Sequence, residues 1–199
     1  MTSLKVDTPS CADPKGRETF GGQTYAEMPL DGKIVPLKVD FFLPAQTQRP
    51  APVLVWLGAD VLSKTPAKAT GPRILADFLT SKGVALSVPE VRVGADRADL
   101  PNTVVERLSR IEPRRDTSVD PKLSTFPALA ATEDLCALLA WIEVESARLG
   151  LSGKTVLAGA STGAGLAFNV CVVAPHLGLY RPDPDGVMSY SGTCPWPSL

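Results

Sequence analysis

The stretch LAGASTGAG, residues 157–165, decides how this chain of 199 residues folds. It fits the pattern G-x-S-x-G, in which small residues flank a serine held on a tight turn between a strand and a helix. A side chain at Gly159 or Gly163 would collide with the neighbouring strand or helix, and Ser161 is expected in a strained backbone conformation. The pattern predicts a nucleophile elbow with Ser161 at its tip, although a glycine-rich turn without chemistry also fits it.

The residues on both sides of this turn have the patterns that an elbow requires. Residues 154–158 are rich in β-branched and apolar side chains, as expected of a buried parallel strand. Residues 164–173 are long enough and apolar enough for a buried helix. The amide dipoles of that helix would begin next to Ser161 and favour negative charge there.

Composition indicates a globular protein with one domain. Hydrophobic residues make up 44% and charged residues 21%, and 199 residues suffice for one well-buried core. The formal net charge is −1, so the chain lacks the positive charge of a nucleic-acid binder. No segment has the composition of a signal peptide or a membrane span. We therefore expect a cytoplasmic protein that binds neither nucleic acid nor membrane.

Metal, redox and nucleotide chemistry are not favoured. The cysteines form no C-x-x-C pair, and Cys136 and Cys171 fall on apolar helix faces, where a thiol behaves as a small hydrophobe. The other two cysteines, Cys11 and Cys194, lie near the ends of the chain, and a disulfide between them is an alternative to free thiols. With His176 as the single histidine, we expect no metal site and no cofactor. The glycine spacing is not G-x-G-x-x-G, which argues against nucleotide binding.

Strands alternate with helices along the rest of the chain. We expect a flexible N-terminal arm at residues 1–20 and a single domain at 21–199, in which Pro36 marks an edge position or a bulge. Alternation of this kind implies a three-layer α/β/α sandwich, whose mostly parallel central sheet carries an antiparallel N-terminal hairpin. The expected strands span 24–30, 34–44, 53–57, 84–89, 154–158 and 186–191.

Two helices have apolar stripes that predict their buried faces. In the helix expected at 71–81 the stripe consists of Ile74, Leu75, Phe78 and Leu79. In the helix expected at 127–149 it consists of Leu135, Leu138, Leu139 and Ile142, with Glu133 outside it.

Residues 90–126 form a long connection in which six arginines, Arg92 among them, alternate with acidic residues. This mixture favours a solvated surface with one short amphipathic helix. That helix would present Val104, Val105, Leu108 and Ile111. Because long connections in compact domains often serve as lids or binding loops, a lid-like insertion over Ser161 is the alternative.

Three segments, in the order in which they occur, resemble a known family. They are ATEDL at 131–135 leading to Trp141, LGL at 149–151, and GASTG at 159–163. Together with the order of strands and helices, they resemble the α/β-hydrolase fold, and in particular carboxylesterases and lipases of the hormone-sensitive-lipase type. The resemblance implies a serine hydrolase that acts on a small ester or acyl ligand.

By this resemblance Ser161 would attack the ester carbonyl, and the backbone N–H groups of Thr162 and Ala59 would hold the oxyanion. The family carries His-Gly-Gly-Gly where this chain has LGAD at 57–60. An ionised Asp60 near the oxyanion would oppose its negative charge. We therefore expect Asp60 to turn outward or to weaken the site.

A serine hydroxyl needs a general base, and the base needs a group that orients it. His176 follows Ser161 along the helix, where a rise of 1.5 Å per residue places it roughly 20 Å away. We expect His176 to be a surface or helix-terminal residue and Asp183 and Asp185 to be turn formers. In the family the acid and histidine follow on later strands, so the chain is expected to lack its C-terminal part.

Three hypotheses follow from this. In the first, the chain is an esterase-like enzyme whose remaining strands are absent because it is a fragment or truncated product. In the second, it is a non-catalytic relative that binds an acyl or small hydrophobic ligand. In the third, it is a subunit completed by another chain. An exposed apolar strand at 187–190 would favour the first or the third, because an unpaired edge invites self-association or pairing with another chain.

Overall fold

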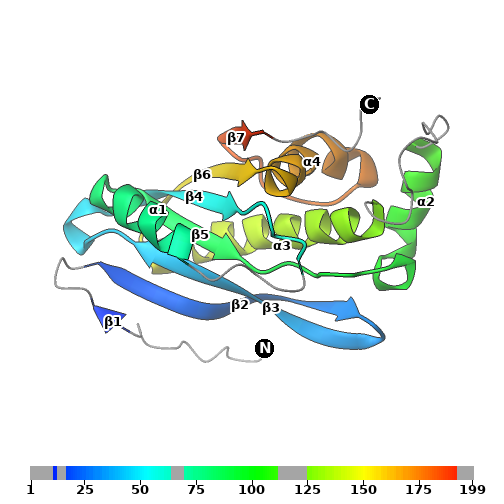
Figure 1. Ribbon diagram of the computed structural model, residues 1–199, viewed down its shortest axis with the longest axis horizontal. Coiled ribbons are helices and arrows are strands. Elements are labelled where there is room, and N and C mark those ends of the chain that lie inside the picture. The colour runs from blue at the N-terminus through cyan, green and yellow to red at the C-terminus, as the bar shows by residue number, and fades with distance from the viewer. Residues whose placement is uncertain (1–10, 13–16, 64–69, 112–124, 192–199) are drawn as a thin grey trace.

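A seven-stranded sheet forms the middle layer of the structure, a computed structural model that describes residues 11–12, 17–63, 70–111 and 125–191. The strands lie in the order β1-β2-β3-β5-β4-β6-β7, with β7 at one margin and β1 at the other (Figure 1). The antiparallel strands are β1 (Cys11–Ala12), β2 (Glu18–Leu30) and β3 (Lys33–Leu43). The parallel strands are β4 (Ala51–Leu57), β5 (Ala85–Pro89), β6 (Leu151–Ala160) and β7 (Gly186–Tyr190).

Helices cover both faces of this sheet, which confirms the predicted α/β/α sandwich. On one face lie α3 (Thr125–Leu149) and α4 (Thr162–Leu177), and α2 (Asn102–Ile111) packs against α4. On the other face lies α1 (Thr70–Ser81), which contacts β5 and β3. Short 3-10 helices span Gln46–Gln48 and Arg97–Asp99.

The N-terminal hairpin forms as predicted, but its first strand begins earlier. β2 starts at Glu18, which pairs with Leu43 of β3, so the last residues of the expected N-terminal arm belong to the sheet. The division into arm and domain remains a prediction. Strand β5 pairs with β3 only from Val39 to Phe42. At Pro36, therefore, β3 has a paired neighbour on one side only, as the proline requires.

The predicted buried face of α1 is wrong in its two largest residues. Ile74 is 70% and Phe78 is 61% exposed, whereas Ala76 and Thr80 are buried against the sheet. The hydroxyl of Thr80 donates a 2.7 Å hydrogen bond to the carbonyl of Ala76, which satisfies the buried polar group within the helix. The stripe predicted for α3 is confirmed, since all four of its residues are buried.

The prediction of a solvated surface at 90–126 is wrong at Arg92. Its guanidinium is fully buried, with Nε 2.8 Å from Oδ1 of Asp134 and a terminal nitrogen 2.6 Å from Oε2 of Glu133. It also donates to the carbonyl oxygens of Pro29, Asp99 and Ala130. One side chain therefore joins the hairpin, the segment after β5 and helix α3.

The predicted amphipathic helix is confirmed as α2, whose Val104, Val105 and Leu108 are buried. They pack with Val173 and Leu177, close to the C-terminal end of α4 and thus at the end opposite Ser161. Residues 112–124 and the side chain of Ile111 lie outside the described part of the chain. The lid remains a prediction.

The buried ion pair predicts how stability depends on pH. Burial raises the pKa of Asp134 from 3.8 to about 7, because loss of hydration outweighs the attraction of Arg92. Between these values the folded chain keeps a proton that the unfolded chain has lost, so the free energy of unfolding falls as pH rises from about 4 to about 7. Denaturant unfolding at several pH values should show this fall in the wild type and a flatter profile in Asp134→Asn. Glu143→Gln, an exposed carboxylate on the same helix, is the control; parallel profiles for wild type and Asp134→Asn would contradict the assignment.

Candidate active site

The turn between β6 and α4 has the close packing predicted for an elbow. A Cβ placed on Gly163 would overlap the carbonyl oxygen of Leu57, at the end of β4. A Cβ placed on Gly159 would overlap the backbone of Gly163 itself. Only glycine fits at either position, so the steric part of the prediction is confirmed.

Ser161 occupies the tip of this turn in a conformation that side chains rarely adopt. Its φ is 51° and its ψ is −117°, and the residue is exposed. Its N–H donates a 3.0 Å hydrogen bond to the carbonyl of Tyr190, and its own carbonyl accepts from Ala164 and Gly165 in the first turn of α4. The hydroxyl makes no capping hydrogen bond to the helix. The backbone is thus held by hydrogen bonds, and the hydroxyl takes no part in capping the helix.

The two groups proposed to bind an oxyanion lie on neighbouring elements. Thr162 is the first residue of α4, where an N–H has no acceptor within the helix. Ala59 is exposed in the loop after β4, which is closed by a 3.3 Å hydrogen bond from Val61 N–H to the Gly58 carbonyl. Leu57 pairs with Gly159 in the sheet, so this loop and the elbow meet at the carboxyl ends of β4 and β6. The oxyanion role of each N–H remains a prediction.

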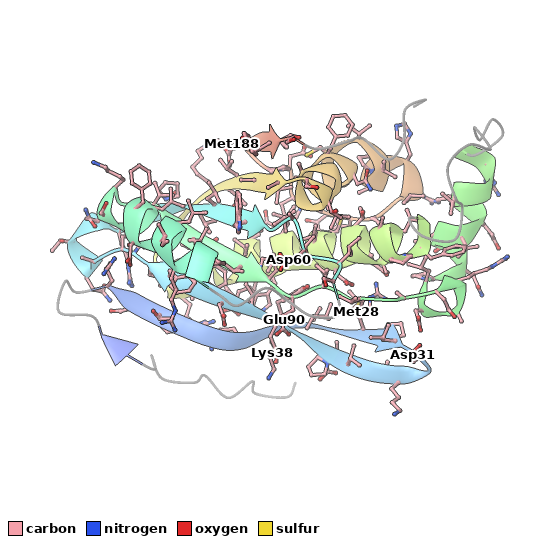
Figure 2. All side chains as sticks on the ribbon, viewed as in Figure 1. Met28, Asp31, Lys38, Asp60, Glu90 and Met188 are labelled. Carbon is pink, nitrogen blue, oxygen red and sulfur yellow. The ribbon has the colours of Figure 1, made fainter. Side chains whose placement is uncertain are left out.

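Asp60 is half-buried at the carboxyl end of β4 (Figure 2). Its Oδ1 lies 2.8 Å from the point where a Cβ on Gly58 would stand, so the carboxylate folds back over that glycine. The carboxylate therefore lies against the backbone of the same loop that carries Ala59. Its negative charge is a feature of the candidate site itself.

The structure brings neither His176 nor the two later aspartates to Ser161. His176 is exposed in the last turn of α4, as predicted. Asp183 pairs with Arg181 at 2.5 Å. Asp185 directly precedes β7 and thus lies at the end of that strand opposite Tyr190, whose carbonyl accepts from Ser161. Its pKa is lowered by a hydrogen bond from Lys154, and it accepts from the N–H of Thr155. Because His176 is the single histidine, no imidazole of this chain reaches the hydroxyl.

Arg92, Glu133 and Asp134 form a group of charged side chains, here called the Arg92 cluster, that the sequence patterns did not reveal. One signal was available: Asp134 lies one helical turn before Leu138 and thus on the apolar stripe of α3. A carboxylate buried there needs a cation, which Arg92 supplies. The cluster is structural, because its polar groups are used by one another and by backbone carbonyls.

Other site chemistry is limited in the described residues. They contain no group of three or more histidine, cysteine or acidic side chains that could hold a metal ion. Cys136 and Cys171 are free thiols, and burial raises the pKa of Cys136 to about 12. The side chains of Cys11 and Cys194 lie outside the described part, so their pairing remains a prediction. No described helix is both long and apolar enough to cross a bilayer.

Comparison with solved structures defines the fold as that of the α/β-hydrolases. Brefeldin A esterase, described as a bacterial homologue of human hormone sensitive lipase, matches with a TM-score of 0.52 and 21% identity over 93% of this chain. Esterase B from Lactobacillus rhamnosis matches with a TM-score of 0.55 and 16% identity over 87% of this chain. The predicted resemblance to esterases of the hormone-sensitive-lipase type is confirmed at the level of the fold.

The matches extend over only part of these proteins. The aligned region covers 42% of brefeldin A esterase and 48% of esterase B, so this chain spans less than half of each. No protein-family model matches the sequence, and no curated protein matches it closely enough to be a relative.

Substitution of the elbow glycine tests the steric constraint. Gly163→Ala should lower the free energy of unfolding by about 3 kcal/mol, at the upper end of what overpacking typically costs, because the new Cβ can be accommodated only if β4 and α4 move apart. Gly186→Ala is the matched control, since a Cβ there would make only an ordinary 3.8 Å contact with Val156. Thermal denaturation of both variants measures the difference. Equal melting temperatures would show that the elbow is not packed as described.

Proposed function

We propose that this chain is the nucleophile-bearing part of a carboxylic-ester hydrolase, with Ser161 as the nucleophile. The observation that carries the proposal is the conformation of Ser161. It is exposed, strained in φ and held by the Tyr190 carbonyl, while its hydroxyl is not used by the helix cap. Strain of this kind is retained only where the surrounding structure enforces it, and it clusters at active sites.

The proposed reaction begins with attack of Ser161 Oγ on the ester carbonyl carbon. The new O–C bond forms as the carbonyl electrons move to oxygen, and the N–H groups of Thr162 and Ala59 would stabilise the resulting oxyanion. The serine proton passes to a base, and the alcohol leaves once it is protonated. Water then hydrolyses the acyl-enzyme. The base and its orienting acid must come from outside the described residues.

The solved structures support ester chemistry as the reaction class. Two of them are named esterases, and one structure of esterase B is described as inhibited by a tributyrin phosphonate. For this chain we propose ester hydrolysis as the reaction and small acyl esters as the substrates. Completion by another polypeptide is the second candidate role, favoured by the exposure of β7 at the sheet margin, where Met188 is 60% and Tyr190 is 77% exposed.

Covalent labelling tests the nucleophile separately from the missing base. A fluorophosphonate should modify Ser161 slowly, because oxyanion stabilisation without a base supplies a rate increase of only about 10³ to 10⁴ over solution. Added imidazole should accelerate labelling in proportion to its concentration, since it can act as the base. Mass spectrometry of peptides locates the adduct. Absence of labelling in the wild type, or labelling that persists in Ser161→Ala, would refute Ser161 as the nucleophile.

The charge of Asp60 should slow the same reaction. A unit charge a few ångströms from the oxyanion costs about 1 kcal/mol in water-like surroundings, so Asp60→Asn should raise the labelling rate by about five-fold. Asp183→Asn is the control, because Asp183 is exposed and paired with Arg181. An unchanged rate in Asp60→Asn would mean that this carboxylate does not face the developing charge.

A further inference from the structure

Ser191, which directly follows β7, is a second serine in a left-handed backbone conformation. Its φ is 53°, close to the φ of 51° at Ser161. In the part of the chain that the structure describes, Asp31 is the one further residue other than glycine with a positive φ. Because Cβ crowds the following carbonyl oxygen in this conformation, it costs free energy and is retained only where the surrounding structure enforces it.

The positive φ of Asp31 has a local cause that Ser191 does not share. Asp31 and Gly32 form the turn between β2 and β3, and aspartate followed by glycine is a preferred pair in such two-residue turns. The N–H of Asp31 also donates to Oδ1 of Asp99. Serine is not among the residue types enriched at positive φ. The conformation of Ser191 therefore resembles that of Ser161 more than that of a turn residue.

The two strained serines lie side by side at the carboxyl ends of neighbouring strands. β6 and β7 are parallel, and their register pairs Ala160 with Tyr190, the residues just before the two serines. The N–H of Ser161 donates a 3.0 Å hydrogen bond to the carbonyl of Tyr190, the group to which the nitrogen of Ser191 is bonded. Adjacent strands are about 4.8 Å apart, so the backbones of the two serines lie about one strand spacing from each other. Both residues are exposed.

Ser191 and the proposed oxyanion loop lie on opposite sides of the elbow. β6 lies between β4 and β7 in the sheet (Figure 1). The loop after β4 carries Ala59, whereas Ser191 follows β7. The three substituents of a carbonyl carbon are spread around it, so when the carbonyl oxygen points toward Ala59, the acyl chain or the alkoxy group points toward the β7 side. Of these two, the alkoxy oxygen is the one that accepts a hydrogen bond from a hydroxyl.

We infer that Ser191 contacts the substrate at the Ser161 site and that its hydroxyl donates a hydrogen bond to the alkoxy oxygen of the ester. The inference rests on the proposed function and extends it to the leaving alcohol. When the tetrahedral intermediate collapses, the C–O bond to the alcohol breaks and its electron pair moves to the alkoxy oxygen. A hydrogen bond from Ser191 stabilises the negative charge that develops there. The leaving alcohol still takes its proton from the base, and Ser191 keeps its own.

Acylation of Ser161 by two aryl acetates tests the inference in the intact chain. Departing phenoxide keeps more negative charge on its oxygen than p-nitrophenoxide, whose ring withdraws that charge. Ser191→Ala should therefore slow acylation by phenyl acetate about five-fold and acylation by p-nitrophenyl acetate less than about two-fold. Mass spectrometry of peptides measures the acetylated Ser161 that forms with time. Ser189→Ala, which removes another exposed hydroxyl of β7, is the control and should leave both rates unchanged.

A second variant separates the hydroxyl of Ser191 from its backbone conformation. Glycine adopts a positive φ without strain, so Ser191→Gly should have a melting temperature at least as high as that of the wild type. It should nevertheless slow acylation by phenyl acetate as much as Ser191→Ala does. A slower reaction in a fold of undiminished stability assigns the loss to the missing hydroxyl.

Three results would contradict a contact between Ser191 and the alkoxy oxygen or the function on which it depends. Equal slowing with both acetates would show that Ser191 acts on Ser161 instead of on the leaving oxygen. Unchanged rates in Ser191→Ala, in a chain whose Ser161 is labelled by a fluorophosphonate, would refute the inference alone. Absence of fluorophosphonate labelling in the wild type would refute the proposed function and the inference with it.

Discussion

The contact between Gly163 and the carbonyl of Leu57 is the constraint on which the rest of this structure depends. It fixes the start of α4 against the end of β4, without room for a single methyl group. Because of this contact, the loop after β4, which carries Ala59, and the turn after β6, which carries Ser161, lie at the same end of the sheet.

This part of the fold could be predicted because its cause is local. The five residues from Gly159 to Gly163 are enough to predict the tight turn, because only glycine fits on either side of the serine. The apolar segments before and after them indicate which strand and which helix the turn connects. The buried face of α3 could also be predicted, since Leu135, Leu138 and Ile142 repeat with the helical period and are buried. For the same local reason, the position of His176 at the end of α4 followed from its distance along the helix.

Other features could not be predicted because their cause lies far away in the sequence. Arg92 is one of six arginines in a charged segment, and only the fold brings Asp134 of α3 to it. In α1, Ile74 and Phe78 fit the helical period as well as Ala76 and Thr80 do. The short side chains face the sheet because they let the helix approach it closely, and that preference depends on the neighbouring strand rather than on the helix.

The hydrogen bond from Ser161 N–H to the Tyr190 carbonyl links the locally determined elbow to a strand that follows 25 residues later. It ties the conformation of the candidate nucleophile to β7, the last of the described strands at this margin of the sheet. A strand at the margin of a sheet with exposed side chains, as β7 has at Met188 and Tyr190, is among the less stable parts of a sheet. Local opening of β7 would also release the backbone of Ser161. Order in β7 and order at the elbow are consequently coupled through a single backbone hydrogen bond.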